Sequence, residues 1–221
     1  QQVQTALKNK QDPEHPSADF SLEPAGASYM DVPALNVNRE EWKARLRKLS
    51  LLFKDTPAAI ASTISLTWRR EVRTFVTSEG ISRQYGRTFA TLSIVARGKA
   101  PDGEDLVALD SYDAENPARL PKDDVLTAAI KKSMATLEKL RTAPQPDPFV
   151  GPAILSGRAA GVFFHEIFGH RIEGHRQTDT QEGQTFSNSV GKAVLPEFLS
   201  VVSDPTLHAT AGEDLNGWYS F

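Results

Sequence analysis

Residues 58–113 constrain the fold most, because their side chains partly alternate between apolar and polar, the period of a half-buried β-strand. Turns with Gly or Pro at residues 78–80 and 101–103 divide the region. The pattern predicts an antiparallel sheet with one face covered by helices. The expected strands are residues 60–67, 71–77, 81–85, 89–96 and 106–111.

Two amphipathic helices are predicted, one on each side of this region. The first follows Asn38, placed as an N-cap with Glu41 three residues later, and runs to about residue 54. The second has Pro121 in its first turn and continues to residue 141. Apolar residues three and four apart give each helix a stripe for burial. These are Trp42, Leu46, Leu49 and Phe53 in the first helix and Leu126, Ile130, Met134, Leu137 and Leu140 in the second.

The N-terminal segment, residues 1–37, is polar and contains several prolines. We expect an extended arm held on the rest of the protein through Tyr29 and Met30. Solvated disorder of the same segment is the alternative.

The fold class expected for the whole chain is α+β. Residues 38–141 form the helix-covered antiparallel sheet, and the Pro-rich residues 142–150 form a stiff linker. Residues 151–221 are interpreted as the start of a second, catalytic domain, with short strands at residues 153–155 and 199–202.

The net charge and the composition of the chain argue against two classes of binding partner. The chain has 221 residues, a net charge of −3 and a pI near 6.0, which argues against a nucleic-acid partner. No apolar run approaches the roughly 18 residues of a transmembrane helix, so no membrane partner is expected. Arg69, Arg70 and Arg73 either bind a substrate carboxylate or pair with acidic residues across the sheet, and pairing is the favoured use.

The region that carries chemistry is residues 161–175, which holds three of the five histidines and two carboxylates. His165 and His170 are five residues apart, whereas the familiar zinc helix places its histidines four apart. In a regular helix this spacing separates the two rings by roughly 140° around the axis. A π-type turn or a break at Gly169 would bring them together on one ion.

The helix itself is predicted from residue 158 to residue 170, with Val162 and Phe163 packed inward. Glu166 and His170 share a face, so Glu166 could act on water beside a metal ion without being a ligand. The alternative is an ordinary amphipathic helix in which Glu166 and His170 form a surface pair.

The motif is similar to that of the TldD/PmbA family of zinc metallopeptidases, also called modulators of DNA gyrase. The resemblance rests on His-Glu-x-x-x-His, with Gly169 before the second histidine and Glu173-Gly174 after it. It implies zinc bound by His165 and His170. It also implies that Glu166 is the general base.

The family's third ligand is a cysteine far downstream of the motif, and this chain contains no cysteine. One expectation is that the 221 residues are a fragment that ends before that cysteine. The other is that the site is incomplete or built differently. Glu173 and His175 are the residues that could replace the missing ligand or orient those present.

The function expected from the sequence is zinc-dependent hydrolysis of peptides or unfolded polypeptide segments, with the activity of this chain alone left open. The alternative is a noncatalytic partner subunit of a TldD/PmbA-type dimer. A peptide substrate and a homodimer or heterodimer are the expected partners. The resemblance implies a cytoplasmic location, and export stays an alternative because the sequence begins at Gln1 rather than Met.

Overall fold

The computed structural model describes residues 24–54, 56–178, 183–204, 209–210 and 213–214. Its backbone divides into two compact units, which we describe separately. The sheet unit comprises residues 23–147, together with the C-terminal residues from 204 onward. The motif unit comprises residues 148–203, together with residues 1–22, which lie outside the described part of the chain.

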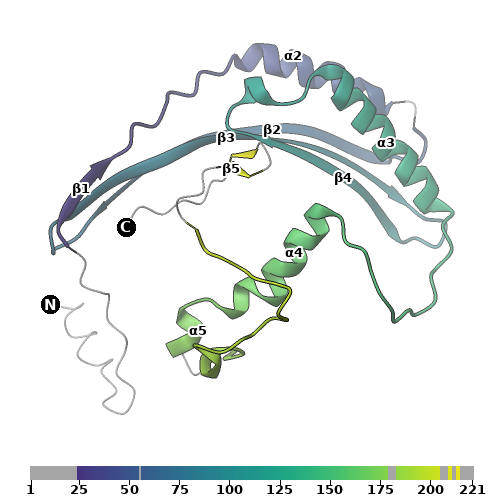
Figure 1. Ribbon diagram of the computed structural model, residues 1–221. Coiled ribbons are helices and arrows are strands. Elements are labelled where there is room, and N and C mark those ends of the chain that lie inside the picture. The colour runs from purple at the N-terminus through teal and green to yellow at the C-terminus, as the bar shows by residue number, and fades with distance from the viewer. Residues whose placement is uncertain (1–23, 55, 179–182, 205–208, 211–212, 215–221) are drawn as a thin grey trace, which may run out of the picture. The chain divides into compact units, whose positions relative to one another are not determined.

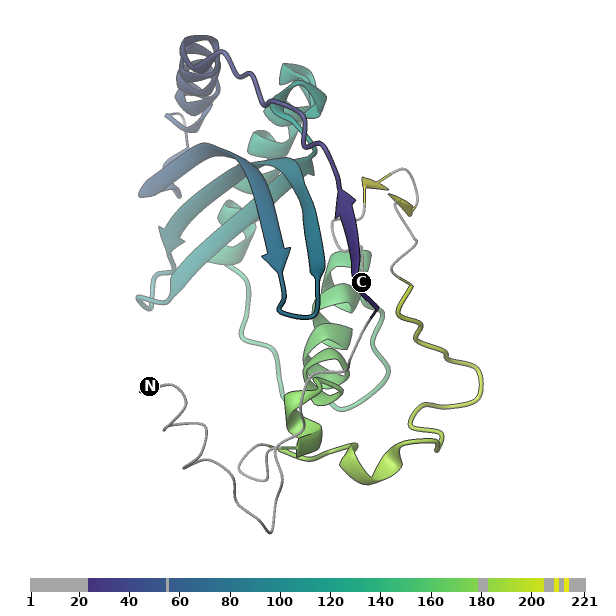
Figure 2. The ribbon, with the colours of Figure 1, turned by 90° about the vertical axis from the view of Figure 1, so that its left-hand side faces the viewer.

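The sheet is organised around one long strand, β3 (Ile81–Lys99). Strand β2 (Ala61–Val76) pairs antiparallel with β3 along one edge, and β4 (Asp105–Ala114) pairs antiparallel with the second half of the other edge. Strand β1 (Gly26–Tyr29) pairs parallel with the first half of that edge, as Figure 2 shows. The α+β class is therefore confirmed, but the sheet is mixed rather than wholly antiparallel.

The strands are longer than the sequence predicted. The two segments expected at residues 60–67 and 71–77 form the single strand β2, and those at 81–85 and 89–96 belong to β3. Residues 68–70 and 86–88 interrupt the alternation without interrupting the ladder, because Trp68 to Arg70 pair with Thr88 to Ala90.

Gly86 explains why the alternation of apolar and polar side chains is interrupted at residues 86–88. A Cβ atom placed on Gly86 would lie 2.1 Å from the backbone oxygen of Glu71 and 2.8 Å from Cγ2 of Val32. Val32 is 3% exposed, whereas Tyr29 is 67% exposed. The buried contact of the N-terminal segment is thus Val32 over Gly86. The expected anchoring by Tyr29 and Met30 is confirmed as well, since the Tyr29 hydroxyl lies 2.9 Å from Ser82 Oγ and the Met30 N–H donates to the Gln84 carbonyl at 2.7 Å. Residues 1–23 of the predicted arm lie outside the described residues.

The first helix, α2 (Arg39–Ser50), begins where the sequence predicted. The Asn38 side chain accepts a hydrogen bond from the Glu41 backbone N–H at 3.2 Å, as an N-cap does. A 3-10 turn, Leu51–Phe53, continues the chain after α2 and carries the buried Phe53.

The second helix, α3 (Asp123–Arg141), starts two residues after Pro121, so that proline precedes the first turn. Asp123 and Asp124 lie in the first turn of α3, and Lys139 and Arg141 lie in its last turn. Charges in these positions interact favourably with the helix dipole and stabilise the helix. Arg45 of α2 joins the two helices by bonds to the Asp123 carboxylate and to the Pro121 carbonyl.

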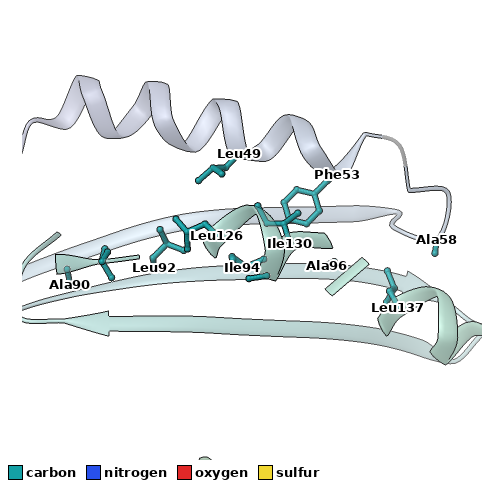
Figure 3. Close-up of a cluster of buried hydrophobic side chains, with 12 residues drawn as sticks. Leu49, Phe53, Ala58, Ala90, Leu92, Ile94, Ala96, Leu126, Ile130 and Leu137 are labelled. Atoms are coloured by element: carbon teal, nitrogen blue, oxygen red, sulfur yellow. The ribbon is translucent and has the colours of Figure 1, made fainter. Parts of the chain in front are cut away.

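The core lies between β3 and the two helices, which cover one face of the sheet (Figures 1 and 3). Alternate residues of β3 point to the helices, and each is fully buried there. Each large apolar side chain buried in this way contributes about 1.5–3 kcal/mol. The buried members are Ala90, Leu92, Ile94 and Ala96 of β3, Leu49 and Phe53 of the first helical segment, Leu126, Ala129, Ile130 and Leu137 of α3, and Ala58 and Leu120.

The motif unit consists of short helical segments: α4 (Gly157–Ile167), a 3-10 turn (Gly169–Arg171), α5 (His175–Thr178) and a second 3-10 turn (Ser187–Ser189). The strands expected at residues 153–155 and 199–202 do not form; both stretches are irregular. Among the described residues no strand pairs with either stretch, and Ile154 and Val202 are largely exposed.

The predicted inward packing of Val162 and Phe163 is also wrong, since these side chains are 59% and 46% exposed. Strands β5 (Ala209–Thr210) and β6 (Glu213–Asp214) form a short antiparallel pair. None of the described helices has the length and apolar character needed to cross a membrane.

Candidate metal site

The site is built where helix α4 ends. Ser156 precedes the first turn in an extended conformation, and α4 runs to Ile167. Phe168 leaves the helical conformation, although its N–H still bonds to the Phe164 carbonyl at 3.1 Å. A tighter 3-10 turn follows from Gly169 to Arg171.

The break brings the two motif histidines together. His165 lies in the last turn of α4 and His170 lies in the 3-10 turn. Their ring centroids are 4.4 Å apart and the rings are inclined by 77°. A continuous helix would point these rings to different sides. Of the two geometries that the spacing allowed, the structure has the break beside Gly169.

Glu166 completes a group of three potential ligands. One donor atom from each of His165, Glu166 and His170 lies within 4.8 Å of the other two. Glu166 Oε1 is 4.0 Å from His165 Nε2, and both side chains are 62% exposed. The carboxylate is therefore near the imidazoles but is not held by a hydrogen bond to either in the described residues.

Glu173 contacts His170 from the irregular segment before α5. Its Oε1 lies 2.8 Å from His170 Nδ1, and Arg176 Nε donates to its Oε2 at 3.2 Å. His170 chiefly, with Arg176 adding to it, lowers the pKa of the Glu173 carboxyl, which favours the ionised form. Because Glu173 occupies Nδ1, the other ring nitrogen of His170, Nε2, is left for a ligand.

His175, the first residue of α5, is not part of the three-residue group. Its Nε2 lies 3.7 Å from Glu173 Oε2, so it adds positive charge beside that carboxylate when it is protonated. Sequence reasoning did not single out Arg176. Its position three residues after Glu173 could have indicated the ion pair.

The donor set fits a metal ion in kind: imidazole nitrogens are typical zinc ligands, and a carboxylate can either bind the ion or act on water beside it. In a tetrahedral zinc site with bonds near 2.1 Å, two ligand atoms lie about 3.4 Å apart. The donor atoms of the three residues lie within 4.8 Å of one another, so side-chain rotation would have to bring them closer to bind one ion. No cysteine in the chain can supply a thiolate.

A histidine pair with an adjoining carboxylate at a helix end is an arrangement typical of metallopeptidase sites. Residues 150–219 match the family model described as the PmbA/TldA metallopeptidase C-terminal domain. Over this segment the chain is similar to the TldD/PmbA family, as the motif indicated, and the similarity implies a metal ion for the site.

One curated relative is Metalloprotease MJ0996 of Methanocaldococcus jannaschii. It is 31% identical over 91 residues, which are 41% of this chain. The matched stretch spans a fifth of the length of that relative, 20%. No solved structure matches the chain.

Proposed function

We propose that the protein is a zinc-dependent metallopeptidase that cleaves peptides or unfolded polypeptide segments. The observation that carries the proposal is the contact of the His165 and His170 rings across the helix break, with Glu166 beside them. The family match and the relative named as a metalloprotease support the same reaction class.

In this proposal His165 and His170 would bind the zinc ion, and Glu173 orients His170 by accepting a hydrogen bond from its Nδ1–H. Zinc held at such a site supplies a Lewis acid and lowers the pKa of water to about 7. Glu166 acts as the general base: its carboxylate accepts a proton from the attacking water and passes it to the leaving amine. Its exposure leaves it accessible to water and peptide.

The second candidate is a noncatalytic partner subunit of a TldD/PmbA-type dimer. The absence of cysteine favours it, because the resemblance implies a cysteine as the third ligand. The intact His-Glu-x-x-x-His sequence favours the enzyme. The two candidates differ in one measurable property, which is peptide cleavage by zinc-loaded protein.

The test uses the full-length protein and measures zinc content together with cleavage of a labelled unfolded polypeptide. We expect about one zinc per chain, lost in His165→Ala and in His170→Ala. Glu166→Gln should keep zinc and lower the cleavage rate by about 10²–10⁴-fold. Glu197→Gln, an exposed carboxylate of the same unit, is the matched control and should change neither.

Zinc binding without cleavage in the unaltered protein would favour the noncatalytic subunit. Cleavage that survives Glu166→Gln would overturn the role of Glu166 as the base. Zinc content unaffected by both histidine substitutions would overturn the metal site itself.

A further inference from the structure

The carboxylate of Glu173 has a contact at each of its two oxygens. Its Oε1 lies 2.8 Å from Nδ1 of His170, and its Oε2 accepts a hydrogen bond from Nε of Arg176 at 3.2 Å. An ionised carboxylate can only accept, so the proton of the first contact is on Nδ1 of His170. Arg176 is therefore connected to His170 through Glu173.

The backbone fixes the spacing of the two charged residues in this series. The Arg176 N–H donates to the Glu173 carbonyl at 3.1 Å, which closes a turn where α5 begins. Residues three apart in a helical turn present their side chains on the same side. The Arg176 side chain is 25% exposed and the Glu173 side chain is 35% exposed, so the contact is partly sheltered from water.

A carboxylate beside a metal site can also bind the ion directly, which would give Glu173 a different role. Glu173 does not belong to the group of three potential ligands, which is His165, Glu166 and His170. Its oxygens contact a ring nitrogen and a guanidinium group instead. The partner of the second oxygen therefore decides whether the carboxylate stays on His170.

Among the described residues, Arg176 and His175 lie near that second oxygen, and Arg176 is the one at hydrogen-bonding distance. Arg176 Nε is 3.2 Å from Oε2 of Glu173, whereas His175 Nε2 is 3.7 Å from it. A guanidinium group is always charged and presents its donors in a fixed plane. Arg176 is thus suited to hold Glu173 in one orientation.

We propose that Arg176 is a positioning residue of the metal site: it holds Glu173 on Nδ1 of His170 and so leaves Nε2 of that ring available to a metal ion. The inference rests on the proposed function and extends it to a residue that is neither a ligand nor the base. With Arg176 present, the carboxylate cannot turn without breaking a charge-assisted hydrogen bond. Without Arg176 the carboxylate can rotate away, and the His170 ring loses the partner that orients it.

The sign of the effect on metal affinity separates positioning from electrostatic repulsion. Arg176 is a cation beside a site for a divalent cation, so the loss of its charge alone would tighten metal binding. Loss of positioning would weaken metal binding, because residues that orient a ligating histidine contribute to metal affinity. A weaker affinity after removal of this positive charge therefore indicates positioning.

The zinc affinity of the full-length protein, measured by competition with a chromogenic chelator, tests the inference. Arg176→Gln should weaken zinc binding by about threefold to tenfold, which is less than the effect of Glu173→Ala because the carboxylate is still present. Arg176→Lys should restore most of the affinity, since its ammonium group can donate to the same oxygen.

Lys192→Gln is the matched control. It removes one positive charge from the same unit, and the Lys192 ammonium group donates to the Asn188 carbonyl at 2.9 Å. The zinc affinity of this control should equal that of the unaltered protein. Circular dichroism establishes that each variant is folded.

A double-mutant cycle shows whether Arg176 acts through Glu173. In the Glu173→Ala background, Arg176→Gln should weaken zinc binding no further, because the carboxylate that it positions is gone. If Arg176 supported the site through its other contacts, its loss would weaken zinc binding by the same factor in both backgrounds.

Three results would overturn the inference. Arg176→Gln leaves zinc affinity unchanged or tightens it, or it weakens zinc binding equally with and without Glu173. Arg176→Lys binds zinc as weakly as Arg176→Gln. If the unaltered protein binds no zinc, the proposed function falls together with this inference. If zinc binds and the Arg176 variants behave as the control does, the proposed function stands and this inference alone falls.

Discussion

Glu173 Oε1 lies 2.8 Å from Nδ1 of His170, so one carboxylate fixes which ring nitrogen of this histidine can reach a metal ion. Carboxylates that orient ligating histidines typically change metal affinity 10–100-fold when they are removed. Glu173→Ala should therefore weaken zinc affinity by about 10–100-fold, measured by competition with a chromogenic chelator. Glu197→Ala, on the same unit, is the control. Equal zinc affinity in both variants would mean that Glu173 does not orient His170.

Gly86 should not tolerate a side chain. Gly86→Ala places a methyl group against the Glu71 carbonyl and the Val32 side chain, so the strand or the N-terminal segment must move. We expect a loss of about 1–3 kcal/mol in the free energy of unfolding, measured by urea denaturation. Gly26→Ala in β1 is the matched control, because no atom lies within 4 Å of the added Cβ. A smaller loss at Gly86 than at Gly26 would contradict the packing of Val32 over β3.

Ile130 is fully buried on α3 between the sheet and α2, whereas Val125 of the same helix is 46% exposed. Ile130→Ala should lower the free energy of unfolding by about 2–5 kcal/mol, because it removes buried methyl groups and leaves a cavity. Val125→Ala should cost less than about 1 kcal/mol. Similar losses for the two variants would argue against α3 being packed through the Ile130 face.

Glu71 should make stability depend on pH. The hydrogen bond from Arg69, followed by those from the Arg87 side chain, lowers the pKa of the Glu71 carboxyl below its ordinary value of 4.5. The ionised form therefore stabilises the fold above pH 4.5, and this contribution is lost as the pH falls through the lowered pKa. Thermal midpoints of the protein and of Glu71→Gln should differ at about pH 7 and converge as the pH falls below 4.5. A constant difference over that range would contradict this role.

The helices and most of the sheet could be predicted because their signals are local. Asn38 caps α2 as its spacing with Glu41 indicated, and Leu126, Ile130 and Leu137 form the buried stripe of α3. The parallel pairing of β1 could not be predicted, because the four residues Gly26–Tyr29 carry no periodic pattern. Their register with β3 is a long-range property of the chain.

Apolar composition misled the prediction where none of the described elements covers the apolar side chains. Residues 153–155 have strand-like composition, yet Ile154 is fully exposed and the segment stays irregular. Val162 was expected inward for the same reason and is exposed. An apolar composition indicates that burial of the segment would be favourable. It does not indicate which other part of the chain would cover these side chains.

The helix break at the candidate site was predicted from the spacing of its histidines. The spacing of His165 and His170 required a departure from regular helix, and Gly169 marked its position. The assignments of these histidines as ligands and of Glu166 as base stay predictions until metal binding is measured. Arg70, one of three arginines considered for pairing, instead donates to the carbonyls of Val32 and Pro33. Backbone acceptors of this kind leave no trace in the sequence.

Strand β3 pairs with each of the other three strands of the four-stranded sheet, and none of those three pairs with another. The sheet therefore has no redundant connection. A proteolytic cut in the turn at residues 101–104 would leave every ladder intact, and the two pieces would still hold together. A cut within β3 would deprive β1, β2 and β4 of backbone partners at once. The resistance of the whole four-stranded sheet to proteolysis therefore depends on how rarely β3 becomes accessible to a protease.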